Sequence, residues 1–339
     1  MGSHLDTVRG GGRFDGISGV IAALEVLRRF EEKGIETFHP VEVVAFLAEE
    51  PSPFGISTVG SRGMVGELSQ KALASLQDDK GRTLAMAIQE MGGDPSRIDE
   101  AKRFSGDVLA YLELHIEQGP FLFTQGIPVG VVTGIVGISR GRIEVRGSPD
   151  HPGTTPMETR KDALVASSEA ILALERVCKG LEGVVGTMGK IEVYPNSENV
   201  IPGIVTLKME IRSLREASLD EAISLLKEEL DRIAGKRGVT INLETGLTMR
   251  PAIFPETMVE HISSVCKRHN IPYVKMVSGA GHDATHMARL ASTGMIFIPS
   301  RDGKSHCPEE WSEFEHIGLG AEILAGTIIE IDRENLIVA

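Results

Sequence analysis

The sequence predicts an α/β protein in which a domain with a mainly parallel sheet is interrupted by a second, smaller domain. Three apolar runs, at residues 41–47, 109–114 and 294–299, are short and rich in branched side chains. Such runs are typical of strands buried on both faces, as in a parallel sheet covered by helices. Residues 129–246 instead show long strand patterns around two helical ones, which indicates an inserted domain.

The first helix of the larger domain is predicted from apolar residues at helical spacing. The stripe comprises Val20, Ile21, Leu24, Leu27 and Phe30. Gly34 comes soon after it, and glycine commonly closes a helix because it adopts the left-handed backbone without strain. The run at 41–47 then supplies a strand. Helix and strand patterns alternate here, as α/β architecture requires.

The inserted domain is predicted to have the element order β-α-β-β-α-β of a ferredoxin-like unit. Its elements are expected at 129–147, 160–178, 184–193, 203–212, 218–234 and 239–244. Ser218 and Glu221 form a capping box for the second helix. The predicted boundaries are therefore 1–128 and 247–339 for the larger domain, and 129–246 for the insert.

Composition and charge exclude two classes of partner. The 339-residue chain has a formal net charge of −13, whereas nucleic-acid binding needs a clustered basic surface. It contains no apolar run of about 18 residues, the length that a membrane-spanning helix needs. Cys178, Cys266 and Cys307 are odd in number and lack metal-ligand spacing. They indicate reduced thiols in a cytoplasmic protein.

Histidines and acidic residues cluster at the ends of the predicted strands. Four of them follow the three apolar runs: Glu49, Glu50, His115 and His306. The carboxyl ends of strands in an open α/β sheet meet at one crevice, so these side chains can converge. Three more lie in the glycine-rich opening segment: His4, Asp6 and Asp15. Histidines with carboxylates are the usual ligands of zinc or manganese.

Each of these residues also has an ordinary structural explanation. A lone His115 or His306 is more often a hydrogen-bonded structural histidine than a metal ligand. The Glu49–Glu50 pair could belong to a solvated loop, and Asp15 before a glycine is typical of a turn. Their occurrence together in one chain favours a metal site.

Nine ordered motifs resemble those of the M20-type metallohydrolases: GSHLDTV, GGRFDG, AEE, LELHIEQGP, HPGTTPM, NVIPG, EIRS, SGAGHDA and SHCPEEW. Within this family the sequence is most similar to the branch of N-carbamoyl-L-amino-acid hydrolases, allantoate amidohydrolases and β-ureidopropionases. The resemblance covers essentially the whole chain. His115 is the most specific feature, because peptidase branches usually carry an acidic residue at that position.

The resemblance implies a site for two divalent cations, zinc or manganese, with cobalt or nickel as alternatives. The first ion would be held by His4, Asp15 and His115, the second by Asp15, Glu50 and His306. Two cations that share a carboxylate can activate one water molecule. Cys307 is not expected to be a ligand, because adjacent side chains point apart.

The same resemblance assigns catalytic roles to two further residues. Asp6 is expected to orient His4. Glu49 is expected to take a proton from the attacking water and deliver it to the departing nitrogen.

Five positions match those that contact the substrate in this family: Gln118, His151, Asn199, Arg212 and Gly281. Arg212 suits a bidentate grip on a carboxylate, although a surface ion pair is the alternative. His151 would reach the active site of the partner subunit in a homodimer and polarise the scissile carbonyl. For His282, substrate contact and a buried structural role are both open.

The expected reaction is hydrolysis of an N-carbamoyl-L-amino acid to the amino acid, ammonia and carbon dioxide. Allantoate amidohydrolase or β-ureidopropionase activity is the alternative, and an inactive truncated fragment or binding subunit is the non-enzyme alternative. Family members carry a segment before GSHLDTV, including a strand, that is missing here. The sequence therefore predicts a poorly soluble, weakly metallated or inactive chain, because no strand would hold His4 and Asp6.

Overall fold

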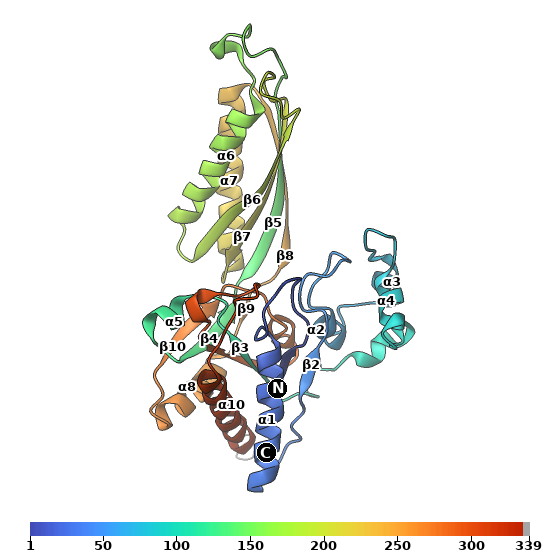
Figure 1. Ribbon diagram of the computed structural model, residues 1–339, viewed down its shortest axis with the longest axis vertical. Helices are drawn as coiled ribbons and strands as arrows, with labels where there is room; N and C mark the ends of the chain where they lie inside the picture. Colours follow the sequence, from blue (N-terminus) through green and yellow to red (C-terminus); the bar gives the residue numbers. More distant parts are fainter. Residues whose placement is uncertain (335–339) are drawn as a thin grey trace. The chain divides into compact units, whose positions relative to one another are not determined.

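The computed structural model describes residues 1–334 and divides into two compact units (Figure 1). The first unit comprises residues 1–135 and, from residue 253, the rest of the described chain. The second unit comprises residues 136–252. No helix in the described part of the chain is long and apolar enough to cross a membrane.

The main sheet of the first unit is mixed, so the prediction of a mainly parallel sheet is wrong. Its strands are β3 (Ala110–Ile116), β4 (Val129–Ile135), β10 (Tyr273–Ser278) and β11 (Ser292–Ile298), in the order β10-β4-β11-β3, and the short β9 (Ala252–Ile253) completes it. Strand β11 is parallel to β3 but antiparallel to β4.

The connection between β3 and β4 lacks the full helix that usually covers a parallel crossover. It spans residues 117–128 and contains only the five-residue helix α5 (Phe121–Gln125). Strand β4 enters the sheet antiparallel to β11, which is itself parallel to β3.

A separate two-stranded parallel sheet carries the opening motif. It pairs β1 (Gly2–His4) with β2 (Val44–Phe46), which is shorter than the predicted strand at 41–47. Side chains connect β1 to β3: the Tyr111 hydroxyl donates to the carbonyl of Gly2 at 3.1 Å, and the Ser3 hydroxyl donates to Glu113 at 2.7 Å. The opening motif thus forms a buried strand itself, where the sequence predicted that no strand would hold His4.

Three long helices pack on the strands of the first unit: α1 (Ile17–Lys33), α8 (Glu256–Arg268) and α10 (Phe314–Glu334). They lie side by side, with α10 in contact with both of the others (Figure 1). Helix α1 ends at Gly34 in the left-handed conformation, as predicted. Val20 and Phe30 face the core, but Ile21 and Leu24 are half exposed, so the predicted stripe only partly coincides with the buried face.

A group of short helices follows β2 and has its own small core. These are α2 (Val59–Met64), α3 (Gln70–Ser75), α4 (Leu84–Glu90) and the 3-10 helix η1 (Pro95–Ala101). Their shared core consists of Phe54, Leu68, Leu73 and Leu84. Ser69 and Thr83 cap α3 and α4 by accepting backbone N–H groups. Two further short elements of the first unit are α9 (Ala284–Met287) and η3 (Arg301–Gly303).

The second unit has the predicted element order β-α-β-β-α-β. Its elements are β5 (Gly137–Arg146), α6 (Ala163–Gly180), β6 (Val184–Tyr194), β7 (Ile204–Ser213), α7 (Glu216–Arg237) and β8 (Thr240–Met249), with the short η2 (Met157–Thr159) before α6. The sheet is antiparallel in the order β6-β7-β5-β8. Helices α6 and α7 pack together on one face of it (Figure 1).

Two sequence predictions near the second unit need correction. Strand β4 pairs with β10 and β11 in the first unit, whereas the sequence placed residue 129 onward in the insert. Helix α7 begins at Glu216, so Ser218 lies buried inside its first turn. Arg215 occupies the N-cap without a side-chain cap, and the predicted capping box is therefore wrong.

Candidate metal centre

The five residues that the sequence proposed as metal ligands come together at the ends of elements in the first unit. His4 is the last residue of β1, and His115 lies one residue before the end of β3. Asp15 lies two residues before α1 begins. Glu50 follows β2, and His306 follows β11.

Asp15 lies between three imidazole rings. Its Oδ1 is 3.1 Å from Nε2 of His115 and 3.7 Å from Nε2 of His4. Its Oδ2 is 3.1 Å from Nε2 of His306. Two groups that could hold a cation contain Asp15, namely His4–Asp15–His115 and Asp15–Glu50–His306, each with donor atoms within 4.8 Å of one another. A carboxylate common to both groups can bridge two cations.

The hydrogen bonds of His4 and His115 leave the facing ring nitrogens free to act as ligands. Nδ1 of His4 donates to the carbonyl of Asp6 at 2.8 Å, and Nδ1 of His115 donates to the carbonyl of Ile116 at 2.8 Å. In the neutral ring this places the lone pair on Nε2. The two Nε2 atoms lie 3.4 Å apart, so their lone pairs converge on one point beside Asp15. This donor set fits a cation.

The second group contains an unpaired buried oxygen. Oε1 of Glu50 is buried and accepts no hydrogen bond, although Nε2 of His306 is 3.3 Å away. A buried polar atom without a partner is unfavourable. A cation held by Asp15, Glu50 and His306 would satisfy it.

Asp15 and the histidines around it shift one another's pKa. Burial alone would raise the pKa of Asp15, but hydrogen bonds with His115, His306 and His4 hold it far below its usual range. Burial favours neutral His4, yet its hydrogen bond with Asp15 overrides this and raises its pKa to about 10. A cation bound at Nε2 of His4 would displace the proton that Asp15 stabilises there.

Glu49 and Asp6 lie beside this ligand set. The carboxylate of Asp6 accepts the backbone N–H groups of Glu49 and Glu50, both at 3.1 Å. It therefore fixes the loop after β2. Nδ1 of His4 hydrogen-bonds the carbonyl of Asp6, and Oδ1 of the Asp6 carboxylate lies 3.9 Å from the same nitrogen. Glu49 is buried, and burial raises its pKa well above the usual value, an effect that His4 opposes and Asp283 reinforces.

Unusual backbone conformations occur at the centre. Ala48, Gln118 and His306 all have positive φ angles, between 55° and 58°. Non-glycine residues in this region are uncommon and gather at functional sites. Gly16 is required for close approach, because a Cβ atom there would lie 2.4 Å from the ring of His4.

The remaining predicted site residues of the first unit lie close by. Nε2 of Gln118 donates to both oxygens of Asp15, at 3.1 and 3.2 Å, while its Oε1 is buried without a partner. Gly281 precedes His282, whose buried ring contacts that of His115 edge-on, with centroids 4.4 Å apart. His282 is therefore buried and packs against the candidate ligand His115. Cys307 belongs to none of the cation-binding groups found among the described residues.

Three predicted substrate contacts belong to the second unit: His151, Asn199 and Arg212. His151 is exposed, and its Nδ1 accepts the N–H of Gly153 at 3.1 Å, which places the ring proton of neutral His151 on Nε2. Asn199 accepts a hydrogen bond from Ser197. Arg212 donates to Glu210 at 2.6 Å.

Three buried carboxylates around the centre were not predicted. Glu113 accepts hydrogen bonds from Ser3 and Tyr111 and belongs with His115 and His282 to a third group of potential ligands. Burial, reinforced by Glu113, raises the pKa of Asp283 to about 8. The carboxylate of Glu310 accepts the backbone N–H of Asp15. Glu113 stands two residues before His115 in a strand, which alternation could have placed on the same face.

Comparison with known proteins identifies the family. The model of peptidase family M20/M25/M40 matches residues 1–330. An N-carbamoyl-L-amino acid amidohydrolase of Geobacillus stearothermophilus is 40% identical over 331 residues, 98% of this chain and 81% of the relative. The chain belongs to the M20/M25/M40 family.

Other M20 relatives agree with this assignment. An allantoate amidohydrolase of Bacillus subtilis is 33% identical over 331 residues, 97% of this chain and 80% of that one. The crystal structure of an amidase of the hydantoinase/carbamoylase family from Burkholderia multivorans matches with a TM-score of 0.88 at 36% identity, covering 97% of this chain and 80% of that one. M20 proteins are metal-dependent hydrolases, and this chain has candidate metal-binding groups of the required kind.

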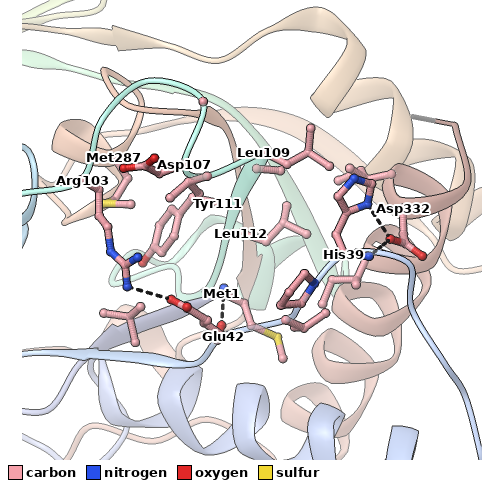
Figure 2. Close-up of a pocket in the computed structure, with 18 of the residues that line it drawn as sticks. Met1, His39, Glu42, Arg103, Asp107, Leu109, Tyr111, Leu112, Met287 and Asp332 are labelled. Atoms are coloured by element: carbon pink, nitrogen blue, oxygen red, sulfur yellow. Dashed lines mark hydrogen bonds and ion pairs between the residues drawn. The ribbon is translucent and has the colours of Figure 1, made fainter. Parts of the chain in front are cut away.

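A cavity of about 300 Å³ in this M20 protein has none of the candidate ligands in its lining (Figure 2). Its lining includes Met1, residues 39–42 and Val44 before and within β2, and residues 106–112 at the start of β3. The candidate ligands His115 and Glu50 instead lie at the end of β3 and after β2. The cavity contains none of the predicted site residues and is not the proposed active site.

Proposed function

We propose that this protein is a metal-dependent amidohydrolase that cleaves a linear C–N amide bond of a ureido group. N-carbamoyl-L-amino acids are the leading substrates. The observation that carries the proposal is the position of Asp15, shared by two cation-binding groups with buried Glu49 beside them. The names of the M20 relatives support the ureido substrate.

The metal ligands in this proposal are His4, Asp15, Glu50, His115 and His306, for two ions of zinc or manganese. When bound, such a pair lowers the pKa of a water molecule and polarises a carbonyl. Glu49 then accepts the proton of the attacking water and passes it to the departing nitrogen. Its buried position keeps this proton away from bulk solvent.

Gln118 supplies a contact suited to a ureido group. Its amide nitrogen is committed to Asp15, which leaves Oε1 buried and without a donor. A ureido group carries N–H donors, and one of them would satisfy this acceptor. Gly281 and Asn199 are proposed as further contacts, and Arg212 as the group that binds the substrate carboxylate.

A substrate panel tests the proposed function. Release of ammonia should be measured on N-carbamoyl-L-amino acids, allantoate, N-carbamoyl-β-alanine and ureidoglycolate, with added Mn²⁺ or Zn²⁺, and cleavage of a dipeptide followed in parallel. The highest kcat/KM is expected on an N-carbamoyl-L-amino acid. Preference for the dipeptide would contradict the ureido proposal, and preference for allantoate would change the substrate within it.

We also propose that the protein acts as a homodimer in which His151 serves the partner's active site. The ring proton on Nε2 of His151 makes it a hydrogen-bond donor for the scissile carbonyl. His151→Ala and Glu49→Gln subunits, each inactive alone, should regain activity when mixed, because a hybrid site then holds both residues. Absence of recovery in a preparation shown to contain heterodimers would rule out action in trans.

A further inference from the structure

Glu310 connects two segments that carry proposed metal ligands. It lies four residues after His306 in the loop that follows β11. Its Oε1 accepts the backbone N–H groups of Phe14 at 2.9 Å and of Asp15 at 3.0 Å. Its Oε2 accepts the hydroxyl of Ser305 at 2.8 Å. The Glu310 carboxylate therefore hydrogen-bonds both the segment of Asp15 and the segment of His306, the two segments that would flank the proposed second cation.

Neighbouring residues make room for the hydrogen bonds of Glu310 and support them. A Cβ atom on Gly12 would lie 2.2 Å from Oε1 of Glu310, so only glycine allows the carboxylate to approach the loop. Phe14 packs edge-on against Trp311, with ring centroids 5.1 Å apart. This aromatic contact lies beside the hydrogen bonds and joins the same two segments.

Glu310 is buried, at 3% exposed, and no ion pair with a lysine, arginine or histidine of residues 1–334 accompanies its hydrogen bonds. Its three hydrogen bonds favour the charged carboxylate, and that charge reinforces the hydrogen bond of Asp15 in raising the pKa of His306. A positive charge near this carboxylate would be stabilised by it. A cation bound through Asp15 and His306 would provide that charge nearby.

We infer that Glu310 is a positioning residue for the metal centre, a role that rests on the proposed function. Its carboxylate fixes the main chain of Asp15 and the segment of His306 so that both side chains meet one cation. Asp6 makes the equivalent contact with the main chain of Glu49 and Glu50. Partners that orient ligands in this way typically contribute about 10–100-fold to metal affinity.

The test compares metal binding in two variants of Glu310. Glu310→Ala removes the hydrogen bonds and the charge, whereas Glu310→Gln removes the charge but keeps an oxygen for Phe14 and Asp15. Each metal-free protein should be titrated with Co²⁺ against a competing chelator, and the visible spectrum of bound Co²⁺ recorded. We expect Glu310→Ala to lose about 10–100-fold in affinity with an altered spectrum, and Glu310→Gln to lose less with a spectrum close to wild type.

Asp332 offers a matched control for the loss of a buried carboxylate. It accepts the backbone N–H groups of Phe38 at 2.9 Å and His39 at 3.0 Å, contacts Nδ1 of the His39 ring at 2.9 Å, and lines the cavity that contains no candidate ligand (Figure 2). Asp332→Ala should lower the melting temperature of the metal-free protein, as Glu310→Ala does, but leave Co²⁺ affinity and the Co²⁺ spectrum unchanged.

Three results would overturn the inference. These are an unchanged Co²⁺ spectrum and affinity in both Glu310 variants, an equal loss of affinity in Asp332→Ala, or a wild-type protein that binds no Co²⁺. If wild type binds Co²⁺ but cleaves no ureido compound, the proposed substrate fails while the role of Glu310 stands. The metal readouts thus separate the two proposals.

Discussion

Replacing Glu49 by glutamine should lower turnover by about 10²-fold or more without lowering the metal content, because the proposed general base is lost but no proposed ligand is removed. Burial raises the pKa of Glu49 in the metal-free protein, so a neutral side chain of the same shape is tolerated there. Nearby cations would bring that pKa down and make the carboxylate available as a base. The amide of glutamine cannot take up the proton.

The neighbouring Glu50 gives the matched comparison for this prediction. Glu49 and Glu50 are each 8% exposed, and both donate their backbone N–H to the carboxylate of Asp6. Glu50→Gln should lower the metal content, whereas Glu49→Gln should not. Metal analysis by mass spectrometry and steady-state kinetics on an N-carbamoyl-L-amino acid measure both effects. Loss of metal with retained turnover in Glu49→Gln would mean that the two roles are reversed.

The convergence of the candidate ligands was predictable because it depends on local patterns. Strands rich in branched residues could be located, and the candidate ligands follow or end such strands, as His115 does in β3. The direction of β4 was not predictable from the same patterns. It depends on whether the connection from residue 117 to 128 turns back. The apolar pattern of a buried strand is the same whether the strand is parallel or antiparallel to its neighbour.

Long-range contacts explain most of what the sequence did not reveal. Glu310 bonds to Asp15 across nearly the whole chain, and no local spacing links the two residues. The capping box at Ser218 failed for a related reason. A serine with a glutamate three residues later fits a helix start. Helix α7 begins two residues earlier, however, and Ser218 is buried inside its first turn, so it is not the N-cap.

Replacing Asp15 by alanine is expected to abolish activity and lower metal content to well below that of wild type, because Asp15 is the proposed ligand common to both candidate groups. Loss of one ligand from a single group would weaken one ion, as in Glu50→Gln. Loss of Asp15 also removes the negative charge that three imidazole rings face. Metal analysis after dialysis against a weak chelator distinguishes these cases.

The metal-free Asp15→Ala protein should also differ from wild type in how its stability depends on pH. Burial opposes the charged form of His4, but Asp15 raises its pKa to about 10 in the folded wild type, above its usual value of 6.5. The resulting stabilisation is fully present below about pH 6.5 and is lost as pH rises towards 10. Asp15 itself stays ionised throughout this window, since its pKa is lowered.

Denaturant unfolding of both metal-free proteins between pH 6.5 and 9 therefore tests whether Asp15 raises the pKa of His4. The free energy of unfolding of wild type should fall with pH across this range, and that of Asp15→Ala should fall less, because the raised pKa of His4 depends on the carboxylate. Equal slopes in the two proteins would show that Asp15 does not hold the charge on the rings. Retention of both ions and of turnover in Asp15→Ala would rule out its place as the shared ligand.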